Sequence, residues 1–175
     1  MLSLFDNISF SPVYTSLEVI FFFTSFLAYY QTDRRKFLVL NSLAIFAIGI
    51  SFYLKGGMVG ALVELGMLII HISAFFISSE IEKRLKLLIP PLAFILVYYF
   101  NDEVSAHFIA LAISFFVLGV YQENMKLNKL FFAIGLIFLS MYSFSLGLTF
   151  IGITNLFGIL VLSYRVRSMY RNTKQ

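Results

Sequence analysis

The sequence predicts an all-α integral membrane protein with seven transmembrane helices. Hydrophobic residues make up 60% of the 175-residue chain and charged residues only 13%, whereas about 25% of a typical soluble domain is charged. Seven apolar segments follow one another along the chain, and the basic residues fall almost entirely in alternate gaps between them. Composition, segment count and charge pattern together indicate this fold class.

The seven apolar segments are expected to be helices of unequal length. They cover residues 13–30, 37–54, 58–78, 87–100, 104–121, 130–146 and 149–164. A helix that crosses the hydrocarbon needs roughly 20 residues, and segments one, two, three and five meet or approach this length. Segment four is short and contains Pro90 and Pro91, so we expect a kink or a first-turn position there, because proline lacks a backbone donor. An alternative with five crossings, in which segments four and five form a re-entrant hairpin, preserves the charge pattern.

The basic residues predict the orientation of the chain. Of the 13 Lys and Arg residues, only Lys55 lies in an even-numbered gap. The others are Arg34, Arg35 and Lys36; Lys83, Arg84 and Lys86; Lys126 and Lys129; and Arg165, Arg167, Arg171 and Lys174. Positive charge is retained in the cytoplasm during insertion, so the pattern predicts an N-out, C-in topology. The net charge of +4 is interpreted as topology and contact with anionic lipid, not as nucleic-acid binding.

We expect a single membrane domain over residues 1–175. The gaps are too short for a soluble domain, and the first segment lacks a small-residue cleavage site, so it is expected to be a retained span instead of a signal peptide. The chain contains no Cys, which excludes disulfides, thiolate metal sites and thiol catalysis. Tyrosines near segment ends, among them Tyr29 and Tyr121, are interpreted as an aromatic belt, and the phenylalanines as lipid-facing bulk.

An internal repeat is expected at an offset of 91 residues. The offset aligns Tyr30-Gln31 with Tyr121-Gln122, Arg35 with Lys126, Gly56 with Gly147, Leu65 with Leu156, and Glu64 with Asn155. It predicts repeat one at 13–78, a linker helix at 87–100, repeat two at 104–164 and a short cytoplasmic tail at 165–175. A single linker helix restores the orientation of the second triplet, so the repeats are expected to be parallel. Transporters with such repeats bind substrate at the repeat interface.

This 3+1+3 arrangement resembles the SWEET/PQ-loop (MtN3-like) superfamily of sugar and small-metabolite transporters. Within it, residues 30–69, which begin YQTDRRKFLVLN, and residues 153–165, ITNLFGILVLSYR, resemble the bacterial inner-membrane YgjV-like family. The resemblance implies a bacterial inner-membrane location and transport through a central cavity. SWEET-type transporters place an Asn on each third helix in that cavity. The resemblance therefore implies a substrate contact for Asn155, while Glu64 departs from the pattern, as Tyr30 departs from the Pro of the Pro-Gln motif.

The candidate substrate-binding residues are the polar residues inside the apolar segments, Glu64, Asn155, His71 and Glu18. An ionisable group within a span is costly and usually faces a cavity, so it points to function. Glu64 and His71 are seven residues apart and therefore share one helix face. A structural alternative remains for each candidate. Glu64 would then form an interhelical hydrogen bond to Asn155 or a tyrosine, and Glu18 would extend outward to the membrane surface.

No catalytic or metal-ligand motif is found, so an enzyme is not expected. Two classes of function remain. The first is a facilitative or proton-linked transporter of a small polar metabolite, and the second is a non-transporting membrane receptor, sensor or assembly factor. A transporter should have a water-filled central cavity lined by Glu64, Asn155 and His71. A structural protein should satisfy these groups mutually and fill its centre with Phe and Leu. No cofactor or metal is expected; the expected partners are the lipid bilayer and a small-molecule substrate or proton, and a homo-oligomer stays open.

Overall fold

The structure of the chain, a computed structural model, describes residues 12–76, 79–100 and 104–171. These residues form seven α-helices, which confirms the predicted all-α fold class. The helices are α1 (Pro12–Tyr30), α2 (Arg34–Leu54), α3 (Met58–Ser73), α4 (Ser79–Phe100), α5 (Val104–Val120), α6 (Met125–Ser145) and α7 (Thr149–Arg171). The predicted acidic gap at 101–103, Lys174 and the end of the third apolar segment at 77–78 lie outside the described residues.

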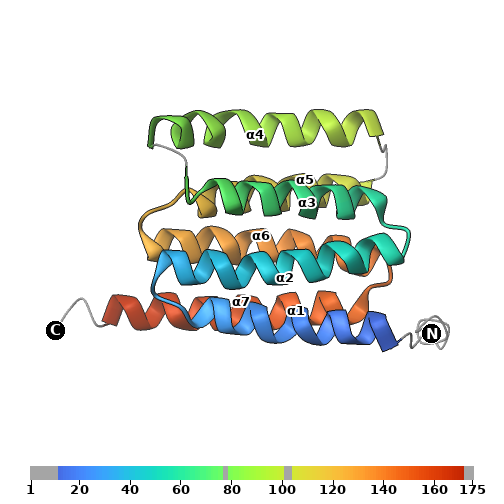
Figure 1. Cartoon of the computed structure of the whole chain (residues 1–175), viewed down its shortest axis with the longest axis horizontal. Helices are drawn as coiled ribbons and strands as arrows, with labels where there is room; N and C mark the ends of the chain where they lie inside the picture. The colour runs from blue at the N-terminus through green and yellow to red at the C-terminus, as the bar shows by residue number, and fades with distance from the viewer. Residues whose placement is uncertain (1–11, 77–78, 101–103, 172–175) are drawn as a thin grey trace.

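Six of these helices form a closed ring of two layers (Figure 1). In one layer α1 packs on α2 and α2 on α3; in the other, α5 packs on α6 and α6 on α7. Contacts of α1 with α7 and of α3 with α5 join the two layers along their edges. The remaining helix, α4, packs on α5 at the outside of the ring. The middle of the ring therefore lies between α2 and α6.

The surface of the bundle is that of a helical membrane protein. Four helices, α1, α2, α6 and α7, are long and apolar enough to cross a membrane, and α3 and much of α5 are shorter apolar helices. Large apolar side chains are exposed on every described helix except α5, with Leu87 77% exposed and Phe23 60% exposed. Soluble monomers rarely expose apolar patches larger than a few hundred Å², so a surface this apolar fits a lipid environment.

The fourth helix differs most from its sequence prediction. It begins at Ser79 and has 22 residues, where the sequence predicted a short segment from residue 87. Glu80 and Glu82 lie in its first turn, where carboxylates interact favourably with the helix dipole. Pro90 and Pro91 lie inside the helix, so the predicted first-turn position is wrong. α4 and α5 have 22 and 17 residues, and neither is among the four helices that are both long and apolar enough to cross a membrane, so the choice between two crossings and a re-entrant hairpin stays a prediction.

Other helix boundaries also shift. The third helix ends at Ser73 instead of continuing to residue 78, and α7 continues to Arg171 instead of ending at residue 164. The sixth helix begins at Met125, because the side chain of Asn124 caps it by accepting a hydrogen bond from the Lys126 backbone. Helix ends depend on such caps as much as on hydropathy.

The basic residues gather at one end of the bundle, which we call the basic end. The C-terminal ends of α1, α3, α5 and α7 and the N-terminal ends of α2, α4 and α6 all lie there, on the left of Figure 1. Arg34, Arg84, Lys126 and Arg165 belong to these helix ends, whereas Lys55 caps α2 at the opposite end. The charge segregation read from the sequence is therefore also a segregation in space.

Candidate functional site

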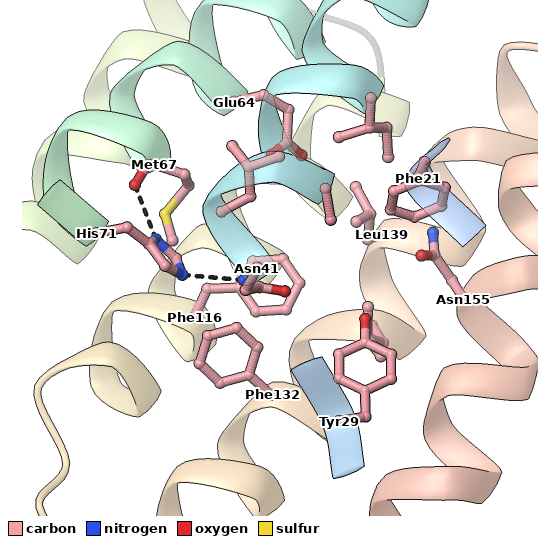
Figure 2. Close-up of a pocket in the computed structure, with 14 residues that line it drawn as sticks. Phe21, Tyr29, Asn41, Glu64, Met67, His71, Phe116, Phe132, Leu139 and Asn155 are labelled. Carbon is pink, nitrogen blue, oxygen red and sulfur yellow. Dashed lines mark hydrogen bonds between the residues drawn. The ribbon is translucent and has the colours of Figure 1, made fainter. Parts of the chain in front are cut away.

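A small internal cavity lies in the middle of the ring, lined by residues of α1, α2, α3, α5, α6 and α7 (Figure 2). The space that the centres of water molecules can occupy there is about 30 Å³, and one water needs roughly 10–15 Å³ of such space. The cavity therefore has room for about two water molecules in this conformation. All its lining residues are buried: Phe21, Tyr29, Asn41, Ala44, Ile45, Ile48, Glu64, Met67, His71, Phe116, Phe132, Leu136, Leu139 and Asn155.

Glu64 extends from α3 into this cavity (Figure 2). Its side chain is only 3% exposed, and the described residues include no hydrogen-bond or ion-pair partner for its carboxyl group. Gly49 on α2 lies opposite, and a Cβ atom there would come within 3.2 Å of the Glu64 Cβ. The small residue allows α2 and α3 to approach closely beside Glu64. An unpaired buried carboxyl group is costly and needs a proton, water or ligand to satisfy it.

Asn155 enters the cavity from α7 and is also unpaired. It is 1% exposed, and neither its Nδ2 nor its Oδ1 has a hydrogen-bond partner within the described part of the chain. Glu64 and Asn155 line the same cavity without bonding to each other. The Glu64–Asn155 hydrogen bond, one of the two bonds that the structural alternative allows, is therefore not formed.

His71 lies in the same cavity, but its ring nitrogens are both in use. Nδ1 lies 2.9 Å from the Met67 carbonyl oxygen, which only accepts, so Nδ1 carries the proton. Nε2 then accepts a hydrogen bond from Asn41 Nδ2 at 2.9 Å. This bond joins α3 to α2 at the cavity wall and fixes a neutral imidazole. His71 is therefore a positioned wall residue, whereas the Asn155 amide has no hydrogen-bond partner among the described residues.

Glu18 does not line the cavity. It is half-buried on α1, one turn from Tyr14, and both lie near Lys55 from the far end of α2. The Lys55 Nζ atom lies 4.6 Å from the centre of the Tyr14 ring. The structure thus places Glu18 in a cluster at the end of the bundle opposite the basic end.

Several residues at or beside the cavity were not among the candidates. Tyr29, which the sequence assigned to an aromatic belt, is 3% exposed and lines the cavity, and that assignment is wrong. The buried Phe116 and Phe132 likewise correct the interpretation of the phenylalanines as lipid-facing. Lys129 is 0% exposed, and its Nζ donates to the Tyr29 carbonyl oxygen at 2.6 Å. Lys129 follows the helix cap Asn124 by five residues, and this spacing could have placed it inside α6.

At the basic end, cations cap helix carbonyls across the two layers. Besides Lys129, Arg165 of α7 donates to the Tyr30 carbonyl oxygen of α1 at 3.0 Å. Arg34 of α2 donates to the Val120 carbonyl oxygen of α5 at 2.9 and 3.3 Å, and to Glu82 of α4 at 3.1 Å. The last carbonyls of α1 and α5 have no partner within their own helices, so these bonds satisfy them and join the layers at once.

No protein-family model, no curated protein and no solved structure matches the chain. Within the described residues, no group of three or more His, Asp or Glu side chains is arranged to hold a metal ion. The function of the site is therefore inferred from its geometry and chemistry.

Proposed function

We propose that the protein is a transporter, facilitative or proton-linked, that moves a small polar metabolite across a bacterial inner membrane. Its plan is SWEET-like, with α1–α3 and α5–α7 as parallel repeats, α4 as the linker, and an N-out, C-in orientation. Substrate binds in the central cavity between the repeats. The observation that carries this proposal is that two buried polar side chains, the Glu64 carboxyl group and the unpartnered Asn155 amide, face one cavity.

The contacts of the ring support the repeat. Exchanging α1, α2 and α3 for α5, α6 and α7 turns every ring contact into another ring contact: α1–α2 into α5–α6, α2–α3 into α6–α7, and α3–α5 into α7–α1. A two-fold relation between the layers requires this correspondence. Parallel repeats in known transporters are related by such an axis along the membrane normal.

Local geometry supports the same 91-residue offset. Gly56 and Gly147 both have a positive φ, 78° and 72°, at the turns that follow α2 and α6. Asp33 and Asn124 both cap the N-terminus of the next helix through their side chains. The glycine pair was already part of the sequence alignment, whereas the capping pair Asp33 and Asn124 was not. Both pairs occur at matching points of the two layers.

The cavity lies where a two-fold axis would pass. Four pairs of lining residues are related by the offset: Asn41 and Phe132, Ile45 and Leu136, Ile48 and Leu139, and Glu64 and Asn155. A site on the axis is touched by both repeats, so movement of one repeat against the other can expose it to either side. The cation–carbonyl bonds join the two layers at the basic end, and the proposal assigns the present conformation to an occluded state.

The caps at the basic end also fit two related halves. Tyr29 and Val120 are separated by the repeat offset, and each carbonyl receives a cation from the other layer, Lys129 for Tyr29 and Arg34 for Val120. Opening toward this side would break both sets of bonds. The proposal thus assigns them the role of an inner gate.

Uptake by purified protein in liposomes tests the proposal. A metabolite panel is first screened for thermal stabilisation, and the compounds that stabilise the protein are then tested for uptake. We expect Asn155→Ala to reduce uptake about 10-fold or more, because it removes a buried polar contact to substrate. Glu64→Gln should abolish any pH-dependent flux, since it removes the carboxyl group while Tyr29, His71 and Asn41 remain around the cavity.

The matched control is Gly66→Ala on the same helix as Glu64, because a Cβ there meets nothing within 4 Å. It should express and transport like wild type. If no compound is taken up, or if Asn155→Ala and Glu64→Gln transport as wild type does, the central-site proposal is wrong. The non-transporting receptor or sensor would then be favoured, particularly if a compound stabilises the protein without uptake.

A further inference from the structure

We propose that the central cavity selects a small organic cation, with Glu64 as its counter-ion and the surrounding aromatic rings as its apolar wall. This inference rests on the proposed function, because it names the substrate class of the same site. It is drawn from the chemistry of the cavity lining.

The charge of the lining favours a cation. Glu64 is the one carboxyl group among the lining residues, and these include no Lys or Arg. His71 is held neutral by its bonds to Met67 and Asn41, and the nearby Lys129 ammonium group is bonded to the Tyr29 carbonyl. A carboxylate in an apolar enclosure is stable only with a cation or a proton beside it. An anionic substrate would face repulsion and no compensating charge.

The apolar part of the lining suits an organic ammonium ion. Four aromatic rings, those of Phe21, Tyr29, Phe116 and Phe132, line the cavity, and Figure 2 shows the rings of Phe132 and Tyr29 below the Glu64 carboxyl group. The centres of the Phe116 and Phe132 rings are 5.3 Å apart. Aromatic faces attract cations, and cages of such rings recognise quaternary ammonium groups.

The small number of polar groups in the lining argues against a sugar or a divalent metal ion as the substrate. A sugar needs several hydrogen-bond partners, whereas the lining has few polar side chains, and two of these, His71 and Asn41, are bonded to each other. A divalent metal needs more ligands than one carboxyl group and one amide. An organic cation would place its ammonium group at Glu64, its apolar body on the rings and one polar group at Asn155.

The size of the cavity sets a condition on binding. In the described conformation it holds about two waters, since its 30 Å³ compares with roughly 10–15 Å³ for one. The cation therefore enters a conformation in which the two layers have moved apart, and it must stabilise that conformation. Ligand binding should accordingly be visible in the thermal stability of the whole protein.

The test compares choline with 3,3-dimethylbutan-1-ol, which has the same shape and hydroxyl group but no charge. The full-length protein is purified in detergent, and its unfolding is followed by circular dichroism at increasing concentrations of each probe. We expect choline to stabilise the protein at concentrations about 10-fold or more below those at which the alcohol acts. Labelled choline should also enter liposomes that contain the protein.

Two charge-matched variants complete the test. Glu64→Gln should weaken the choline response about 10-fold or more, because it removes the buried charge partner. Glu80→Gln removes an exposed carboxyl group from the first turn of α4 and should leave the response unchanged. If Glu64→Gln does not fold, the comparison of the two probes on the wild-type protein still decides.

The outcomes separate the two proposals. Equal effects of choline and the alcohol, or a choline response that survives Glu64→Gln, would overturn the cation assignment. If a neutral metabolite is then transported and Asn155→Ala abolishes its uptake, the proposal of transport through the central site stands without the cation assignment. If nothing binds and nothing is transported, both proposals fail.

Discussion

At the scale of single residues, Gly158 shows how closely the wall of the cavity is packed. A Cβ atom on Gly158 of α7 would lie 2.7 Å from Tyr29 Cε2 and 2.9 Å from Leu136 Cδ1, and both of these residues line the cavity. Substitution with alanine must therefore displace a ring or a core leucine. Overpacking of this kind costs about 1–3 kcal/mol.

This packing gives a prediction with an internal control. Gly158→Ala should lower the thermal midpoint of unfolding, measured by circular dichroism in detergent. Gly66→Ala introduces the same group into α3 where nothing lies within 4 Å. It should leave the midpoint unchanged or raise it, because alanine is favoured over glycine in a helix by about 1 kcal/mol. Equal losses in the two variants would contradict the packing described here.

Individual residues also show what the sequence could and could not predict. Glu64, Asn155 and His71 were found because polar groups in apolar segments are costly, and the structure places all of them in one cavity. Tyr29 and Lys129 were missed because their burial depends on contacts between residues 100 positions apart in the chain. Hydropathy near a helix end does not distinguish a side chain at the membrane surface from one that faces another layer.

At the scale of elements, the link between α2 and α5 depends on Arg34. Its guanidinium group is hydrogen-bonded to the last residue of α5, Val120, and to Glu82 of α4. The neighbouring Arg35 is exposed, and it borders the same surface pocket as Arg34 at the basic end. Arg34 and Arg35 carry equal charge. Substituting each in turn therefore separates the effect of losing the Arg34 hydrogen bonds from the effect of losing a positive charge.

We predict that Arg34→Gln increases access to the cavity from the basic end and that Arg35→Gln does not. The reporter is Ala44→Cys, a buried cavity position in a chain that contains no other cysteine. A charged thiol reagent applied to inside-out vesicles should modify it about 10-fold or more faster in Arg34→Gln, because hydrogen bonds to charged groups contribute about 1.5–3 kcal/mol. Equal rates in the two variants would remove Arg34 from the gate.

Element boundaries were predictable where hydropathy decides and failed where capping decides. The limits of α1 and the C-terminal end of α2 follow the apolar segments within a residue. The start of α6 follows the Asn124 cap, and the start of α4 precedes its apolar segment because the acidic residues of its first turn suit a helix N-terminus. These interactions extend helices into residues that a hydropathy pattern assigns to gaps.

At the scale of the whole molecule, the two ends of the bundle differ in charge and should lie on different sides of the membrane. Seven helices in alternating directions place the N-terminal end of α1 opposite the C-terminal end of α7 (Figure 1). The basic end contains the start of α2 and of α6 and the end of α7. Because basic residues remain on the cytoplasmic side, Thr15 should face outward and Ser168 inward.

Single cysteines in this naturally cysteine-free chain test the orientation and the number of crossings together. In intact cells, a membrane-impermeant maleimide should label Thr15→Cys and Tyr99→Cys, which lies near the far end of α4 and is 78% exposed. It should label Ser168→Cys only after the cells are permeabilised. Labelling at position 15 but not at 99 would indicate the five-crossing re-entrant hairpin. The repeats would then lose the transmembrane linker that makes them parallel, and the shared central site would lose its basis.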